Sequence, residues 1–216
     1  MSVPPPELLH DDADGAIARL VLAHGAGAPM DHAWMNAMTE RLVARGISVT
    51  RFEFPFMAAR RAGGKRSPAP RAEKLTGNYA AAIAAVRTER ASDKLFIGGK
   101  SLGGRVASLI ADEEYAAGRI AGLVCLGYPF HPPKKPEKLR TAHLARLDCP
   151  ALIIQGTRDP LGSREELSGY GLDKRIGIVW LEDGDHDLKP RKRSGETFDG
   201  HLDAAADAIR GFVEAR

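Results

Sequence analysis

Three residues, Ser101, Asp159 and His186, have the types and the chain order needed for nucleophilic catalysis. Ser101 is the centre of Gly99-Lys100-Ser101-Leu102-Gly103, a G-x-S-x-G pattern that is typical of a serine at a sharp strand-to-helix turn. Glycines two residues before and after the serine are expected because a Cβ there would clash with the backbone. A serine hydroxyl becomes a good nucleophile only when a base takes its proton. We expect His186 to be that base and Asp159 to hold its imidazole in one tautomer.

Each of these assignments has a simpler alternative. A chain with 23 glycines can contain the pentapeptide by chance, as an ordinary turn. Asp159 can be a turn aspartate before proline, and His186, which lies among aspartates, a solvated loop histidine. His131 is the main competitor as general base because it also lies in a loop after a predicted strand. The position of His186 after the last predicted strand favours it over His131.

A serine nucleophile also requires backbone donors for the oxyanion that forms at the substrate carbonyl. The N–H of Leu102, directly after the serine, is the first predicted donor. The second should come from the loop after the first predicted strand, 24–28, where small residues allow close approach, and we assign it to Ala26. The alternative is a tight glycine turn without a ligand. We expect His24 to brace this loop rather than to react.

The elements that must position these residues alternate between strands and helices. Apolar runs predict six short strands. Their residues are apolar in succession rather than alternately, as in a parallel sheet covered on both faces. In such a sheet the functional residues gather at the carboxyl ends of the strands. Residues 1–15 are predicted to be a flexible N-terminal arm and residues 16–216 a single domain. The segment 56–75 is predicted to be a long loop, and Thr141–Leu147 a short helix. The predicted strands are 16–22, 47–54, 94–97, 120–126, 150–155 and 176–181, and the main helices 31–45, 79–90, 101–112 and 201–213.

Several segments resemble a known family when they are taken together: LAHGAGAPMDHAWM, RFEFPFMAAR, GGKSLGGRVAS, GYPFHPP, QGTRDP and GDHDL. They look like the small α/β-hydrolase-like family of dienelactone-hydrolase-like bacterial proteins, whose eukaryotic relatives are a testis-expressed protein and a subunit of the nonspecific-lethal chromatin complex. The resemblance covers the chain from about Leu20 to its end. It implies an α/β-hydrolase fold with a minimal lid or none, and a triad of Ser101, Asp159 and His186. Dienelactone hydrolases themselves use a cysteine nucleophile, so the serine here argues against that particular activity.

The expected reaction is hydrolysis of a carboxylic ester or thioester through an acyl-enzyme on Ser101, or acyl transfer by the same route. The competing hypothesis is a catalytically weak interaction module, because the chromatin relative is thought of as a scaffold. No metal and no organic cofactor are expected. Cys125 and Cys149 have no metal-ligand spacing, and two cysteines without an export signal are expected to be reduced. The absence of a secretory signal and of a membrane-spanning run favours a cytoplasmic protein without a membrane partner.

Basic residues concentrate in three loops at the predicted carboxyl edge of the sheet. Segments 56–74, 131–140 and 187–193 contain 14 basic and three acidic residues, whereas the whole chain has a net charge of +3. We interpret these loops as a basic rim that attracts an anionic acyl substrate or an acidic partner. The alternative is solvated loop charge. Nucleic acid is not an expected partner, since no binding motif is present. The candidate substrate-binding residues are His24, Arg60, Lys100 and His131.

Overall fold

The computed structural model describes residues 3–64 and 68–216 of the chain, and its centre is a seven-stranded sheet of order β1-β3-β2-β4-β5-β6-β7. All neighbouring strands are parallel except β1, which is antiparallel to β3. This confirms the predicted mostly parallel α/β sheet. The strands are β1 (Leu8–Asp11), β2 (Ala18–Ala23), β3 (Ile47–Phe52), β4 (Leu95–Lys100), β5 (Gly122–Leu126), β6 (Ala151–Gly156) and β7 (Ile176–Leu181).

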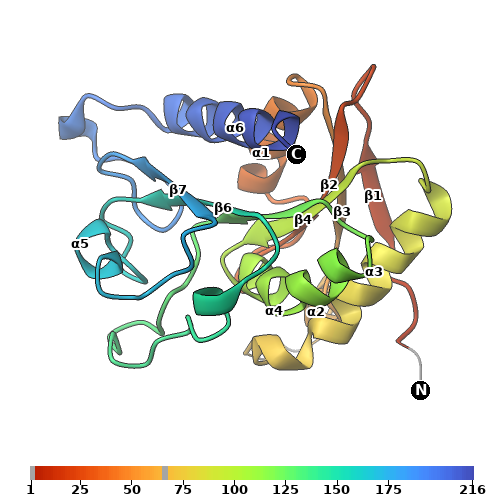
Figure 1. The fold of residues 1–216 in the computed structure, drawn as a ribbon, viewed down its shortest axis with the longest axis horizontal. Coiled ribbons are helices and arrows are strands. Elements are labelled where there is room, and N and C mark those ends of the chain that lie inside the picture. Colours follow the sequence, from red (N-terminus) through yellow and green to blue (C-terminus); the bar gives the residue numbers. More distant parts are fainter. Residues whose placement is uncertain (1–2, 65–67) are drawn as a thin grey trace.

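Helices cover both faces of the sheet. Helices α1 and α6 lie on one face and α3 and α4 on the other (Figure 1). The described residues carry no inserted lid domain. None of the described helices is long and apolar enough to cross a bilayer. The helices are α1 (Ala33–Val43), α2 (Pro55–Arg61), α3 (Thr76–Glu89), α4 (Leu102–Ala116), α5 (Arg164–Leu167) and α6 (Phe198–Glu214), and single 3-10 turns are formed by η1 (Ala72–Lys74), η2 (Leu144–Arg146) and η3 (Lys192–Ser194).

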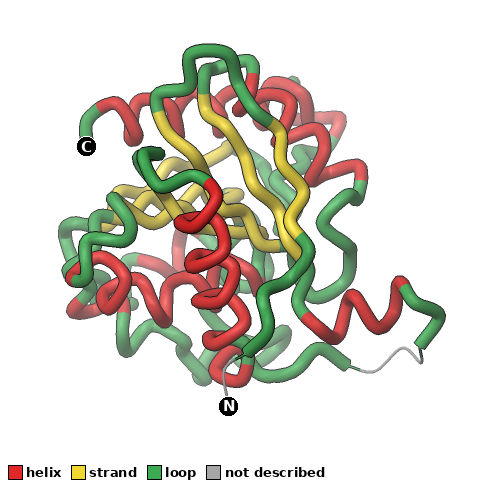
Figure 2. The backbone as a smooth tube through the Cα atoms, turned by 90° about the vertical axis from the view of Figure 1, so that its right-hand side faces the viewer, coloured by secondary structure: helices red, strands yellow, loops and turns green. Residues whose placement is uncertain are grey.

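The continuous hydrophobicity of the central strands follows from this layering. Successive side chains of a strand point to opposite faces, so both sets must be apolar when both faces are covered. In β2, Val21 and Ala23 belong to the core under α3 and α4, whereas Leu20 and Leu22 belong to the core under α1 and α6. Figure 2 shows the sheet between these two helical layers, seen from the side of β1.

The structure corrects the sequence-based element predictions in three segments. Residues 8–11, placed in the flexible arm, form the edge strand β1, because β3 otherwise has a free edge with which they pair. The predicted long loop 56–75 contains α2 and η1; Pro55 begins α2, and its buried residues Phe56 and Met57 hold the helix against the core. Thr141–Leu147 holds only the single turn η2.

Candidate active site

The turn between β4 and α4 places Ser101 at the carboxyl edge of the sheet. Ser101 has φ 51° and ψ −112°, a combination that is strained for a residue with a side chain. A Cβ on Gly99 would lie 2.5 Å from the carbonyl carbon of Gly103, and a Cβ on Gly103 would lie 2.4 Å from the carbonyl oxygen of Ala23. Both glycines are therefore required by close backbone approach, as the pattern predicts. The Ser101 N–H is fixed by the carbonyl oxygen of Leu126 in β5 at 3.0 Å.

Ser101, His186 and Asp159 form a continuous hydrogen-bonded chain. The Oγ of Ser101 lies 2.8 Å from Nε2 of His186, and Nδ1 of His186 lies 2.8 Å from Oδ2 of Asp159. A carboxylate can only accept, so Nδ1 carries the proton and Nε2 is left to accept from the serine hydroxyl. This is the tautomer that general-base catalysis requires. The three side chains come from the ends of β4, β6 and β7, so the parallel sheet brings them together.

Asp159 is held in a closed polar pocket. Its side chain is fully buried. Besides His186, its oxygens accept hydrogen bonds from the N–H of Leu161 at 2.8 Å and from Nε2 of Gln155 at 2.9 Å. Gln155 in turn accepts the N–H of Tyr128 at 2.8 Å. The sequence reasoning missed Gln155; the available signal was a glutamine at the end of an otherwise apolar buried strand.

The loop after β2 lies beside the serine, where the second oxyanion donor is predicted. A Cβ on Gly25 would be 3.7 Å from Cβ of Ser101. The backbone N–H groups of Ala26 and Leu102 have no backbone acceptor among the described residues. Donors to an oxyanion must be available in this way before the substrate binds. His24 braces this loop as expected: Nδ1–H donates to the Gly25 carbonyl at 2.6 Å and Nε2 accepts the Phe54 N–H at 3.1 Å. Burial lowers the pKa of His24, which favours the neutral ring.

The Lys100 side chain binds the loop that contains His186 and Asp187. Its ammonium donates to the carbonyl oxygen of His186 at 2.7 Å and lies 3.2 Å from the Asp187 carboxylate. It also lies 5.7 Å from the centre of the Trp34 ring, whose Nε1 donates to the carbonyl of Asp187 at 2.9 Å. Burial lowers the pKa of Lys100, although the Asp187 charge opposes this shift. Lys100 and Trp34 thus fix the segment that carries His186, a role that the sequence reasoning did not assign to Trp34.

The other two candidate substrate-binding residues lie apart from the serine hydroxyl. His131 is almost fully buried, with Nδ1 2.9 Å from the carbonyl of Pro132 and Nε2 3.5 Å from Glu166. No contact between His131 and Ser101 occurs in the described part of the chain, whereas His186 contacts Ser101 directly. Arg60 stands beside the loop after β2, where it donates to the Ala26 carbonyl at 3.2 Å.

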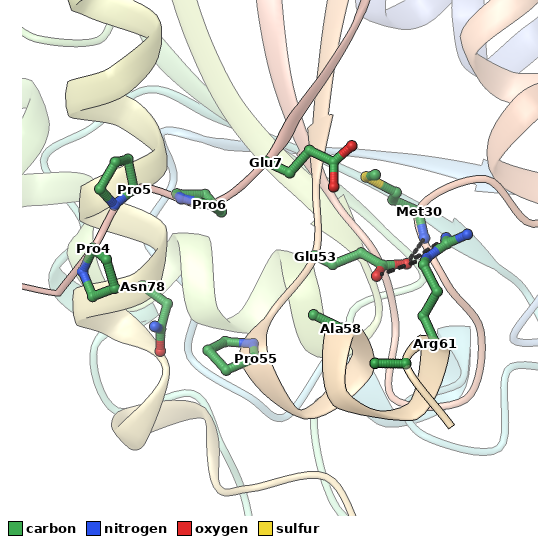
Figure 3. A pocket seen from close by; sticks show the side chains of 11 residues that line it. Pro4, Pro5, Pro6, Glu7, Met30, Glu53, Pro55, Ala58, Arg61 and Asn78 are labelled. Carbon is green, nitrogen blue, oxygen red and sulfur yellow. Dashed lines mark hydrogen bonds and ion pairs between the residues drawn. The ribbon is translucent and has the colours of Figure 1, made fainter. Parts of the chain in front are cut away.

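A cavity of about 400 Å³ opens onto the serine. Its size suits a small acyl group. The walls are Gly25–Ala28, His32, Trp34, Met35, Lys100, Ser101, His186 and Asp187. A separate cavity has a volume of about 560 Å³. Figure 3 shows the prolines of the N-terminal segment on one side of it and the Glu53–Arg61 ion pair on the other. None of the triad residues lines that second cavity.

The predicted basic rim is partly neutralised by carboxylates. Arg61 pairs with Asp31 and Glu53, and Arg191 pairs with Asp183. Lys65 and Arg66, which belong to the same prediction, lie outside the described residues. Within 3–64 and 68–216, no group of three or more histidine, cysteine or acidic side chains is arranged to hold a metal ion.

Comparison with known proteins agrees with the fold. A family model described as an alpha/beta hydrolase domain matches residues 16–214. Among similar solved structures, a dienelactone hydrolase from Anabaena variabilis has a TM-score of 0.71 at 18% identity, covering 96% of this chain and 90% of its own. Est1E from Butyrivibrio proteoclasticus, with ferulic acid bound, has a TM-score of 0.71 at 15% identity, covering 97% and 94%. A serine hydrolase without a lid from Xanthomonas campestris has a TM-score of 0.66 at 18% identity, covering 96% and 88%. At these identities the similar structures establish the fold.

Proposed function

The chain belongs to the alpha/beta hydrolase domain family, and we propose that it is a serine hydrolase that cleaves a carboxylic ester or thioester through an acyl-enzyme on Ser101. The observation that carries the proposal is the unbroken chain Ser101–His186–Asp159, with both hydrogen bonds at 2.8 Å and the carboxylate fully buried. The similar folds include a serine hydrolase and an esterase domain, which supports the same class.

Acylation begins when Oγ of Ser101 attacks the substrate carbonyl carbon as its proton passes to Nε2 of His186. The carbonyl electrons move onto oxygen, and the N–H groups of Leu102 and Ala26 donate to the resulting oxyanion. As the tetrahedral intermediate collapses, the carbonyl re-forms and the bond to the leaving oxygen or sulfur breaks. His186 gives its proton to that leaving group, and the acyl group remains on Ser101.

Deacylation follows the same steps with water as the nucleophile. His186 takes a proton from the water, the resulting hydroxide attacks the acyl carbon, and the Ser101 ester bond breaks as His186 returns the proton to Oγ. Asp159 stabilises the imidazolium in both halves because its buried carboxylate faces Nδ1. Lys100 and Trp34 act as positioning residues, since they hold the backbone of His186 and Asp187.

Labelling with a fluorophosphonate probe tests this proposal directly. Wild-type protein should be labelled, Ser101→Ala should not, and Ser108→Ala should be labelled as the wild type is. Ser108 is a matched control because it too lies 2.8 Å from a histidine Nε2. Equal labelling of Ser101→Ala and wild type, or no labelling of a folded wild type, would remove the hydrolase assignment and favour the interaction-module alternative. If the wild type is labelled and Ser101→Ala is not, a panel of esters and thioesters of varied chain length and charge would define the acyl group.

A further inference from the structure

Arginines in most parts of this molecule are paired with carboxylates. Between α1 and α6, for example, Arg45 lies 2.6 Å from Asp207 and 3.2 Å from Asp203. On the edge of the site, Arg61 and Arg191 are paired in the same way. Further examples are Arg41 with Asp199, Arg119 with Glu114, Arg175 with Asp148 and Asp173, and Arg210 with Glu214.

One cluster departs from this pattern. A cavity of about 420 Å³ is lined entirely by Arg71, Glu73, Lys74, Arg105 and Arg140. Its one carboxylate, Glu73, already lies 2.5 Å from the guanidinium of Arg105. Across residues 3–64 and 68–216, Arg71, Lys74 and Arg140 have no carboxylate within ion-pair distance, and the segment 65–67 contains no acidic residue. Four cations therefore share one carboxylate.

The cluster is also partly removed from water. The Nε of Arg105 is buried and has no hydrogen-bond partner among the described residues. Arg140 is about half-buried, and its burial, followed by the charge of Arg105, lowers the pKa of Arg140. Like charges in a partly desolvated site repel one another more strongly than in water. An anion placed among them would remove this cost and fill the open donor positions.

The cluster lies on the same edge of the sheet as Ser101. In the connection after β3, Arg71 precedes η1 and Lys74 ends it. Arg105 is in the first turn of α4, and Arg140 lies in the loop between β5 and η2. The N–H of Arg105 donates to the carbonyl of Ser101 at 3.0 Å, so its backbone is one helical turn from the nucleophile. The cluster and the serine are therefore both located at the start of α4.

We propose that the cavity formed by Arg71, Glu73, Lys74, Arg105 and Arg140 is a binding site for a phosphate group, borne by the non-acyl part of the substrate. Guanidinium groups match phosphate oxygens with paired donors, and a lysine adds a point charge. The site itself stands on its geometry, whereas its assignment to the substrate rests on the proposed hydrolase function.

Direct binding tests the site without any need for catalysis. Inorganic phosphate is titrated into the full-length Ser101→Ala protein by calorimetry at constant ionic strength. Adding Arg140→Gln should weaken binding about tenfold, the loss expected for one charge-assisted contact. Lys74→Gln changes an exposed side chain and should also weaken phosphate binding. It replaces Arg140→Gln in this test if the Arg140→Gln protein does not fold. Lys174→Gln is the matched control: it removes one exposed charge just before β7, at the opposite edge of the sheet, and should leave the affinity unchanged.

Kinetics distinguish a phosphate carried by the substrate from a free ion. Two esters of the same acyl group are compared, one with a phosphate on its alcohol part and one neutral. For a substrate-borne phosphate, Arg140→Gln should raise KM about tenfold for the phosphate ester only. Phosphate binding that depends on Arg140, with equal KM changes for both esters, would support the site but assign it to free phosphate.

The proposal is overturned if phosphate binds the control and the Arg140→Gln and Lys74→Gln proteins alike, or binds none of them. Failure of the labelling experiment would instead remove the hydrolase function and leave the binding result standing. Added salt should weaken catalysis more for the phosphate ester than for the neutral one; equal salt sensitivity would count against a substrate-borne phosphate.

Discussion

Two serine–histidine pairs lie along α4, and their serine–histidine distances are the same. Ser101, at the start of the helix, is 2.8 Å from Nε2 of His186, and Ser108, two turns later, is 2.8 Å from Nε2 of His143. Within the described residues, only the first pair has a carboxylate hydrogen-bonded to Nδ1 of its histidine. The contact between serine and histidine alone therefore does not define a nucleophile.

The two pairs differ in where the protons lie. Ser108 donates its one hydroxyl hydrogen to the carbonyl of Arg105 at 2.8 Å, so Nε2 of His143 must carry a hydrogen and donate to Ser108. In the first pair the buried Asp159 places the hydrogen on Nδ1 and leaves Nε2 free to accept. Ser108 is also almost fully buried, whereas Ser101 lines a cavity. The carboxylate and the access to substrate distinguish the proposed catalytic pair from a structural one.

Replacing the histidines should give the largest contrast. His186→Ala should lower kcat/KM for an ester substrate by roughly 10⁴-fold or more, since the base and acid of both half-reactions are lost. His143→Ala should change it by less than about threefold, a limit set by its lack of contact with the reacting atoms. Circular dichroism checks that both variants are folded. A large loss in His131→Ala, with activity retained in His186→Ala, would show that His131 is the base.

Asp159→Asn should have the next largest effect. An amide can donate to Nδ1, which leaves the hydrogen on Nε2 and gives His186 the tautomer of His143. We expect a loss of roughly 10³- to 10⁴-fold in kcat at neutral pH. The control is Asp112→Asn, since Asp112 acts on His143 only through its charge and its Oδ1 accepts backbone N–H groups that an amide oxygen can also accept. Comparable losses in the two variants would indicate a general effect of removing charge.

The pH dependence of stability should report on His143. Burial, followed by the charge of Arg105, lowers its pKa from 6.5 to about 4 in the folded protein. Between these values the unfolded chain binds more protons, so stability falls as pH decreases from 6.5 towards 4. The wild type should therefore lose more in Tm than His143→Gln between pH 7 and 4.5. His24, which is shifted in the same direction, is present in both proteins and cancels. Parallel Tm curves would mean that His143 is not shifted.

The stability of a glycine variant relative to an alanine variant should have opposite signs at the two serines. These differences are the smallest changes expected. Ser101 has φ 51°, which glycine adopts without strain, so Ser101→Gly should be more stable than Ser101→Ala by about 1 kcal/mol. Ser108 is inside α4, where glycine is less favourable than alanine by about 1 kcal/mol, so the order should reverse. Denaturant unfolding of the four variants measures both differences. The same order at both sites would argue against stored strain at the elbow.

Local patterns were sufficient for the elements and for the chain order of the site. The strand-to-helix glycines around Ser101 and the continuous apolar strands predicted the elbow and the parallel sheet, because both depend on short-range sterics and side-chain burial. Edge strand β1 was not predictable in this way, since Leu8–Asp11 is ordered only by pairing with a strand nearly 40 residues later.

The sequence by itself determined that a serine, an aspartate and a histidine follow three strands of one sheet. Only the tertiary structure decided which histidine meets which serine, because all three candidates lie in connections between elements: His131 and His143 between β5 and β6, and His186 after β7. It also decided that Lys100 holds the loop of His186, and that Arg71, Lys74, Arg105 and Arg140 gather around the single carboxylate of Glu73. Hydrogen bonds and charge pairs between distant segments depend on packing across the whole sheet, and no local pattern carries that information.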